Sequence, residues 1–291
     1  MIYDVIIIGS GAAALTAAIY SVRYKLNTLV IGKEIGGKMI WTPTIENYPG
    51  FGKISGIELS KKMEDQVKKL GVKVLKEEVK MLCREKELLI IKTEKQRYEA
   101  KSVIVAWGTQ KRKLDVENED KYIGKGIAYC ATCDAPLFRN KDVVVVGGGN
   151  SAAIAVDLLK KYAKKIYMVY LDLFMDPSEL EKIKKDVEII QGTIKKIGGD
   201  KFVKSVTLNS GRKLDVQGIF VEIGDLPNEI PCEKIKIKTN KQGYILTDQN
   251  MKTSVNGIFA IGDCISKPLK QIVTAASDGA TAAHSAYKFL K

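Results

Sequence analysis

The chain has 291 residues, of which 45% are hydrophobic and 28% charged, and its formal net charge is +13. This length allows about two domains of ~100–200 residues, and the hydrophobic content excludes a largely disordered chain. No apolar run reaches the ~18 residues of a transmembrane helix, and the opening residues lack the basic start of a signal peptide, so we expect a cytoplasmic protein without membrane segments.

The positive charge is spread along the chain instead of being gathered in one block. Lysine and glutamate alternate in stretches such as KKMEDQVKK (61–69) and EKIKKDVE (181–188), a pattern typical of solvated helix faces. No basic stretch is interleaved with aromatic residues and no nucleic-acid-binding motif is present, so a nucleic-acid partner is not favoured. The surplus charge would still steer acidic partners toward the protein.

The chain opens with the pattern of a dinucleotide-binding unit. Residues 3–8, YDVIII, predict a buried parallel strand; GSGAAA follows at 9–14, and a helix to about residue 25 leads to a strand at 27–31. A helix at about 58–70 then precedes a small β-meander, with strands expected at 72–76, 79–84, 87–92 and 98–106.

The motif Gly9-x-Gly11-x-x-Ala14 predicts a pyrophosphate site between this strand and helix. Gly9 permits the tight turn, Gly11 lets the backbone approach a phosphate, and Ala14 keeps helix and strand close. Glu34 lies about 20 residues further on, where a carboxylate can accept a ribose hydroxyl; its alternative is a surface loop.

A second unit of the same kind begins in the middle of the chain. DVVVVG at 142–147 predicts a strand, a helix follows at about 150–162, and KIYMVY at 165–170 predicts the next strand. A β-rich stretch, a strand and turn at GIFAIGDC (257–264) and a helix at about 271–290 complete the chain. Two such openings predict an α/β fold with two dinucleotide-type, Rossmann-like domains.

The segment that follows the second glycine loop and the next strand lacks the basic side chains that would hold the 2′-phosphate of NADPH. Gly147-x-Gly149-x-x-Ala152 repeats the spacing of the first motif, but the stretch that follows the next strand, VYLDLFMD (169–176), has no lysine or arginine. NADPH-binding proteins place arginines there for the 2′-phosphate. Asp172 would repel a phosphate, although it could bond an unphosphorylated ribose.

Two of the five cysteines form a C-x-x-C pair, Cys130 and Cys133. Zinc needs about four ligands, no second close pair exists, and the only histidine is His284, so we expect no metal site. The spacing favours a redox dithiol, with a structural bridge as the alternative. Asp134 follows the pair, where it could exchange protons or cap a helix.

These motifs together resemble the low-molecular-weight thioredoxin reductases. The resemblance lies in GSGAAALTAAIY (9–20), GGK (36–38), ENYPGF (46–51), CATCD (130–134), GGGNSA (147–152), GIFAIGDC (257–264) and DGATAA (278–283), in family order along nearly the whole chain. It implies an FAD-binding domain formed by residues 1–112 and 240–291, a three-layer domain at 113–239 inserted in it and carrying the dithiol, a homodimer, and a thioredoxin-like protein as the substrate.

The resemblance also implies roles for individual residues. Cys130, Cys133 and Asp134 would be catalytic, with Cys133 next to the flavin. The residues expected to contact FAD are Gly9, Ser10, Gly11, Ala12, Ala13, Ala14, Gly32, Lys33, Glu34, Gly36, Gly37, Lys38, Asn47, Val79, Ala106, Gly108, Gly262, Asp263, Gln271, Ile272 and Val273. The residues of a vestigial or weak second dinucleotide loop are Gly147, Gly149, Asn150, Ser151 and Ala152.

The chain departs from the family pattern at two places that bear on function. Leu171 and Asp172 stand where the family has paired arginines, and the segment after them is short. Trp107 stands near the expected flavin where a small polar residue is usual; it could cover the ring, block a nicotinamide or simply pack in the core.

We therefore expect an FAD-dependent thioredoxin-disulfide reductase whose electron donor is not NADPH, with an acidic ferredoxin favoured. An NADH- or NADPH-dependent thioredoxin reductase is the first alternative. A reductase of the ferredoxin–NADP class has similar architecture but lacks the dithiol, so CATC (130–133) argues against it. A non-enzymatic, redox-responsive flavoprotein is the last alternative, and the intact pair with Asp134 disfavours it.

Overall fold

The computed structural model describes residues 1–42, 44–228 and 232–291. The chain forms two compact units, one made of Met1–Gln110 with Leu226–Lys291 and one made of Lys111–Asp225. The chain crosses from one unit to the other within two paired strands, β7 (Thr109–Lys111) and β16 (Asp225–Pro227). The described segment 226–228 and 232–239, expected in the inserted module, thus belongs to the first unit.

The first unit is built on an eight-stranded sheet with the order β17-β4-β5-β6-β1-β2-β3, in which β18 also pairs with β6. The strands β1 (Ile2–Ile8), β2 (Thr28–Gly32), β3 (Lys73–Lys76), β6 (Arg97–Val105) and β18 (Ile258–Ala260) pair in parallel. The strands β4 (Val79–Glu85) and β5 (Leu88–Thr93) form the antiparallel meander with β6, and β17 (Cys232–Glu233) adds to its edge.

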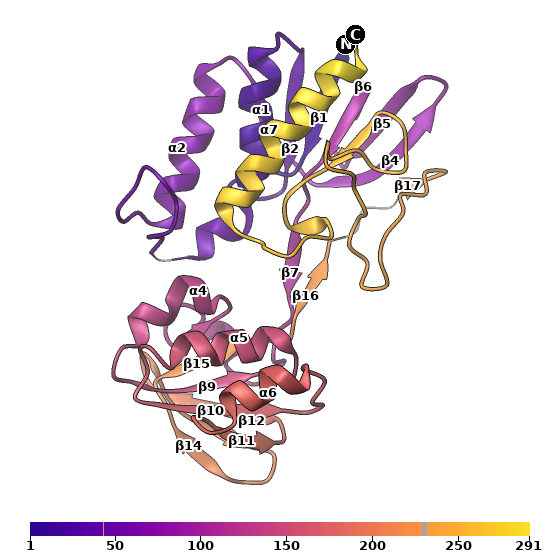
Figure 1. Cartoon of the computed structure of the whole chain (residues 1–291). Coiled ribbons are helices and arrows are strands. Elements are labelled where there is room, and N and C mark those ends of the chain that lie inside the picture. The colour runs from indigo at the N-terminus through magenta and orange to yellow at the C-terminus, as the bar shows by residue number, and fades with distance from the viewer. Residues whose placement is uncertain (43, 229–231) are drawn as a thin grey trace. The chain divides into compact units, whose positions relative to one another are not determined.

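Strand β1 is buried on both faces, which explains its unbroken apolar run. Val5 and Ile7 face a core shared with the helices, whereas Ile6 and Ile8 face a core shared with the meander. Helices α1 (Ala12–Arg23), α2 (Gly56–Lys69) and α7 (Ile272–Phe289) cover the first of these faces (Figure 1). Two short 3₁₀ turns, η1 (Gly37–Trp41) and η3 (Gly262–Cys264), follow β2 and β18.

The second unit also has three layers, with helices on one face of a parallel sheet and a small meander on the other, and it is smaller than the first. Its parallel sheet has the order β11-β10-β9-β15-β8. The strands in chain order are β8 (Ile127–Ala128), β9 (Asp142–Val146), β10 (Lys165–Tyr170), β11 (Glu188–Gln191) and β15 (Gly218–Val221). The meander layer consists of β12 (Ile194–Gly199), β13 (Val203–Leu208) and β14 (Lys213–Asp215).

Short helices complete the second unit. They are α3 (Glu119–Tyr122), α4 (Ala131–Asp134), the 3₁₀ turn η2 (Ala135–Phe138), α5 (Asn150–Leu159) and α6 (Pro177–Ile183). Val143 and Val145 of β9 face the core under the helices, and Val144 and Val146 face the core under the meander. The expected α/β fold, with one Rossmann-like unit inserted in the other, is confirmed.

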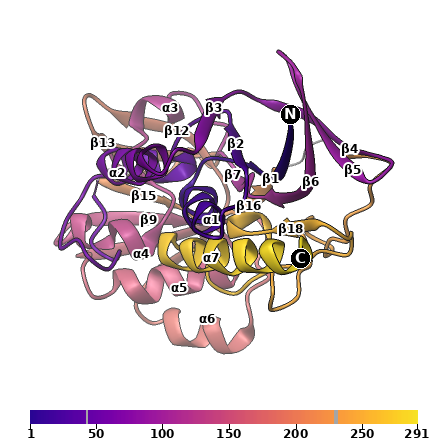
Figure 2. The ribbon, with the colours of Figure 1, turned by 90° about the horizontal axis from the view of Figure 1, so that it is seen from above.

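The helices that close the first unit come from opposite ends of the sequence. Helix α7 packs along α1 (Figure 2), and a Cβ at Gly279 would collide with the Ala13 carbonyl. Within the described parts of the chain, none of the helices has the length and apolar character needed to cross a membrane.

Candidate functional site

The first glycine loop is shaped so that only small residues fit. Gly9, at the end of β1, has a φ of +120°, and a Cβ there would collide with the Ala106 carbonyl. Gly11 caps α1 in an extended conformation, and no acidic side chain lies in the first turn of the helix. The first turn comprises Ala12, Ala13 and Ala14, all buried and too small to cover the helix N-terminus. The loop thus presents free space and backbone N–H groups to an anion.

The segment after β2 is tied to this loop by hydrogen bonds. Ser10 donates its hydroxyl to the Glu34 carbonyl at 2.8 Å, and the Gly36 amide donates to the Ser10 carbonyl at 2.7 Å. A Cβ at Gly32 would collide with the Ser10 side chain, and Gly37 adopts a φ of +53° beside Gly11. The Glu34 side chain is exposed, so it is available to a ribose.

Residues from three distant segments meet beside the loop. The Lys38 ammonium lies 2.7 Å from the Asp263 carboxylate and also 2.7 Å from the Thr109 hydroxyl. The Asn47 amide donates to the Gln271 side chain at 3.1 Å, immediately before the start of α7. The structure therefore brings together the expected contact residues around η1, η3 and the N-terminus of α7.

The other expected contact residues are scattered over several elements of the first unit. Ile272 and Val273 form the first turn of α7, whereas Lys33 is exposed and pairs with Glu78 at 3.3 Å. Val79 is buried at the start of β4, in the core under the meander. Gly108 has a φ of +67° just after β6, and Gly262 has a φ of +75°.

Asp278 is a residue of this region to which the sequence patterns assigned no role. Its carboxylate accepts from the Gly262 amide at 3.0 Å and lies 2.5 Å from the Lys267 ammonium. Both side chains of this ion pair are largely buried, at 11% and 12% exposure. The pair fixes the turn that precedes Asp263, and the DGATAA motif (278–283) was the available signal for it.

The residues of the first unit fit an adenine dinucleotide such as FAD. The glycine cradle between β1 and α1 leaves room where a Cβ would intrude, and the α1 N-terminus faces it. The indole N–H of Trp107 is buried and has no hydrogen-bond partner among the described residues, although the ring packs against the meander core. An unpaired buried donor beside the loop is the kind of group that a cofactor can satisfy.

The C-x-x-C pair lies on a short helical turn of the second unit. Cys130 and Cys133 form a disulfide with their Cα atoms 5.3 Å apart. Cys130 is the N-cap of α4, and its sulfur accepts a hydrogen bond from the Cys133 amide at 3.2 Å. Both cysteines are half-buried. Within 1–42, 44–228 and 232–291, no cluster of three or more His, Cys, Asp or Glu side chains could hold a metal ion.

Asp134 has the environment of a proton-exchanging group. One of its carboxylate oxygens is buried without a hydrogen-bond partner among the described residues, and it makes no side-chain cap bond to the turn that follows. Burial raises the pKa of Asp134 to about 6. A carboxyl group with this pKa can hold or release a proton near neutral pH.

Sequence reasoning missed a second carboxyl group beside the dithiol, Glu222. It follows β15, and the backbone amide of Ala131, the first residue of α4, favours the charged form of the Glu222 carboxyl group. Burial raises the pKa of Glu222 to about 7, against the opposing influence of the Lys111 ammonium. No local sequence pattern marks this residue, because the contact depends on how β15 pairs with β8.

Other segments of the chain lie close against the second glycine loop. A Cβ at Gly148 would collide with the Asp172 carbonyl, and one at Gly149 would collide with the Phe174 ring. The Phe174 amide donates to the Gly148 carbonyl at 2.9 Å. The Asn150 amide donates to the Asp176 carboxylate at 2.7 Å, and the Asp176 backbone amide donates back at 2.8 Å.

The remaining members of this loop have ordinary structural places. Gly147 turns sharply out of β9 with a φ of +154°, against the Glu222 carbonyl. Ala152 is buried in α5, whereas Ser151 is exposed. Leu171 and Phe174 are exposed at 64% and 76%, so apolar side chains surround the position where nucleotide-binding arginines were expected.

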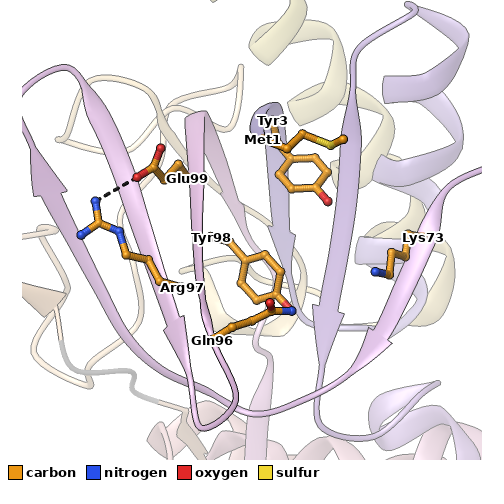
Figure 3. A pocket seen from close by; sticks show the side chains of 7 residues that line it. All are labelled: Met1, Tyr3, Lys73, Gln96, Arg97, Tyr98 and Glu99. Carbon is orange, nitrogen blue, oxygen red and sulfur yellow. Dashed lines mark hydrogen bonds and ion pairs between the residues drawn. The ribbon is translucent and has the colours of Figure 1, made fainter.

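A surface hollow of about 480 Å³ lies elsewhere in the first unit (Figure 3). Its lining includes Tyr3 at the start of β1, and Arg97 and Tyr98 at the start of β6. The glycine loop follows the carboxyl ends of the same parallel strands, which is where α/β sheets bind their ligands. The hollow therefore lies at the amino ends of these strands, opposite the glycine loop, and is not the cofactor site.

Residues 3–279 match the model of the family described as pyridine nucleotide-disulphide oxidoreductase. The chain belongs to this family. It is 41% identical to the thioredoxin reductase of Bacillus subtilis, covering 100% of this chain and 95% of that protein. It is 42% identical to a 34.2 kDa protein in the rubredoxin operon of Clostridium pasteurianum, covering 99% and 97% of the two chains.

Solved structures agree with this assignment. The thioredoxin reductase of Streptococcus pyogenes has a TM-score of 0.92 at 37% identity, covering 99% of this chain and 98% of that one. A ferredoxin-flavin thioredoxin reductase from Clostridium acetobutylicum has a TM-score of 0.55 at 33% identity, covering 99% and 97%. The expected family is confirmed: the chain is a flavin-dependent disulfide oxidoreductase similar to thioredoxin reductases, with FAD as its cofactor.

Proposed function

We propose that this protein reduces the disulfide of a thioredoxin-like protein through Cys130 and Cys133, and that its electron donor is not NADPH but an acidic ferredoxin. The observation that supports the second part is the chain segment that lies against the glycine loop of the second unit. Asp172, Phe174 and Asp176 lie over Gly148, Gly149 and Asn150, where the pyrophosphate of a nicotinamide dinucleotide would bind.

The missing arginines make NADPH binding weaker still. Charge-assisted hydrogen bonds contribute about 1.5–3 kcal/mol each, so losing two of them costs on the order of a hundredfold or more in affinity. No lysine or arginine lies between Tyr170 and Asp176, and Asp172 adds a repelling charge. NADH lacks the 2′-phosphate and escapes this penalty, but the Phe174 ring lies against Gly149, whose counterpart Gly11 in the first loop has room beside it.

Two further observations favour a protein donor of negative charge. The net charge of +13 attracts acidic partners over a long range. One structural relative carries the name ferredoxin-flavin thioredoxin reductase, and one sequence relative is described as a protein in a rubredoxin operon. Ferredoxins are small acidic electron carriers, so they match the charge of this chain.

The proposed chemistry of the chain's own residues is thiol–disulfide exchange. FAD, when bound, supplies the reducing equivalents that open the Cys130–Cys133 disulfide. One cysteine thiolate then attacks a sulfur of the acceptor disulfide and displaces the other acceptor sulfur as a thiolate. The second cysteine attacks the mixed disulfide, so the acceptor leaves as a dithiol and the Cys130–Cys133 bond re-forms. Asp134 would hold and release the protons that the thiols exchange.

An anaerobic titration tests both parts of this proposal. The oxidised protein is mixed with NADPH, NADH or chemically reduced ferredoxin while flavin absorbance is followed, and a disulfide-bonded thioredoxin is then added. We expect ferredoxin to bleach the flavin and the thioredoxin disulfide to be reduced. Rapid bleaching by micromolar NADPH would overturn the donor assignment, and flavin bleaching without acceptor reduction would overturn the reductase assignment.

A further inference from the structure

Glu222 lies level with Cys130 because of the register of the second sheet. In the pairing of β15 with β8, Ile219 lies opposite Ile127 and Phe220 lies opposite Ala128. Glu222 lies two residues after Phe220, and Cys130 lies two residues after Ala128. The backbone of Glu222 is held on its other side, where its amide donates to the Val146 carbonyl at 2.8 Å. This position is set by the sheet and not by a loose loop.

The Glu222 carboxyl group acts on the turn that carries the dithiol. The backbone amide of Ala131, between Cys130 and the exposed Thr132, favours the charged form of this carboxyl group and lowers its pKa. The charged groups that act on it are Lys111 on β7 and Asp225 on β16. These two form an ion pair at 2.8 Å, so the charge of Lys111 is shared between two carboxylates.

We propose that Glu222 is a positioning residue for the dithiol. Its carboxyl group holds the first turn of α4 through the Ala131 amide. Its charge sets the thiolate population of the reduced Cys130–Cys133 pair. A negative charge on Glu222 opposes a second negative charge on the neighbouring sulfur, whereas the protonated form does not. The pair therefore forms its thiolate more readily when Glu222 is neutral.

The burial of Glu222 places this coupling in the physiological range. The pKa of Glu222 is raised to about 7, so the group changes its charge at the pH at which thiol–disulfide exchange takes place. Asp134, with its pKa raised to about 6, lies on the Cys133 side of the same turn. The two carboxyl groups thus flank the dithiol at the two ends of α4.

This inference rests on the Cys130–Cys133 pair being the redox dithiol of the proposed function, and its test needs no electron donor. The protein is reduced with a phosphine, freed of reductant without oxygen, and alkylated with iodoacetamide between about pH 5.5 and 8.5. Peptide mass spectrometry assigns the label to Cys130 or Cys133, and the variants are Glu222→Gln and Glu222→Ala. Glu181→Gln, which removes an exposed carboxylate that pairs with Lys184 on the surface, is the matched control.

We expect Glu222→Gln and wild type to react alike at about pH 5.5, and the variant to react severalfold faster as the pH rises past about 7, because glutamine never acquires the opposing charge. Glu222→Ala should show this faster alkylation together with faster hydrogen exchange of the Ala131 amide, since only alanine lacks the acceptor oxygen. If Glu222→Gln follows wild type over the whole range, the proposal is wrong. If the phosphine-reduced wild-type protein does not reduce an added thioredoxin disulfide, the reductase function fails instead.

Discussion

Asp134 carries a buried carboxylate oxygen without a hydrogen-bond partner among the described residues. Its charged form therefore lowers the free energy of unfolding, by an amount that depends on pH. Its pKa in the folded chain, about 6, lies above the ordinary value of 3.8, so the folded state binds the proton more tightly than the unfolded chain does. The contribution of this group to stability is therefore present below about pH 4 and is lost as the pH rises through about 6.

We expect Asp134→Asn to raise the free energy of unfolding at about pH 8 by on the order of 1 kcal/mol, discounted for the partial solvent access of the group, and to change it little at about pH 4. Urea unfolding followed by circular dichroism at both values measures this difference. Asp215→Asn, at a side chain that is 82% exposed, is the control and should have no such pH dependence. A destabilised Asp134→Asn protein at pH 8 would contradict the assignment of a buried, unpaired carboxylate.

Replacing one sulfur of the dithiol separates cofactor binding from disulfide reduction. We expect Cys133→Ser to retain FAD, because the cradle between β1 and α1 lies in the first unit, and to lose reduction of a thioredoxin disulfide after chemical reduction of the flavin. Flavin absorbance and insulin-coupled thioredoxin turnover measure the two properties. Cys232→Ser, a cysteine of the edge strand β17, serves as the matched control. Turnover by Cys133→Ser near the wild-type rate would show that the pair is not on the electron path.

Helix α7 must approach α1 closely for the first glycine loop to keep its shape. Because a Cβ at Gly279 would collide with the Ala13 carbonyl, we expect Gly279→Ala to push the helices apart and to lower the free energy of unfolding by about 1–3 kcal/mol, although alanine is the better helix former. Release of FAD at lower denaturant concentration, followed by flavin fluorescence, should accompany this loss. Ser277→Ala, an exposed position of the same helix, should change neither property.

At the scale of the whole molecule, the net charge of +13 predicts the salt dependence of electron transfer. Raising the ionic strength from about 0.02 M to 0.3 M shortens the Debye length several times, so the rate of flavin reduction by ferredoxin should fall on the order of tenfold or more. Stopped-flow absorbance measures this rate, and reduced methyl viologen, a small cation, should show no such fall. A ferredoxin rate that is independent of salt would remove the charge argument for this donor.

Local sequence patterns were sufficient for the buried strands β1, β2, β9 and β10, the glycine loops and the C-x-x-C pair, because each is specified by neighbouring residues. The contact between Glu222 and the Ala131 amide depends on the pairing of β15 with β8, which no local pattern determines. The second crossing of the chain, at Asp225 and Leu226, was expected near residue 239. The strand that anchors this segment to the first unit, β17, has only two residues and no detectable periodicity.

The composition of the second glycine loop could be read from the sequence, but its structure could not. The absence of basic residues after β10 was readable from the sequence, and so was the presence of Asp172. That Phe174 would lie on Gly149 and that Asp176 would bond Asn150 was not readable, because the direction of a chain leaving a strand depends on its tertiary contacts. Under the proposed function, we therefore expect that introducing two arginines alone would not confer NADPH binding.

The pairing of α1 with α7 bears on how the protein is made on the ribosome. The contiguous second unit can fold as soon as residues 111–225 have emerged, whereas the first unit must wait for β18 and α7. Until then α1 and its alanine-rich face remain uncovered, and the nascent chain exposes an apolar surface for most of its synthesis. Loading of the cofactor should thus be a late event, and ribosome-bound chains that end before residue 272 should carry a folded dithiol unit without flavin.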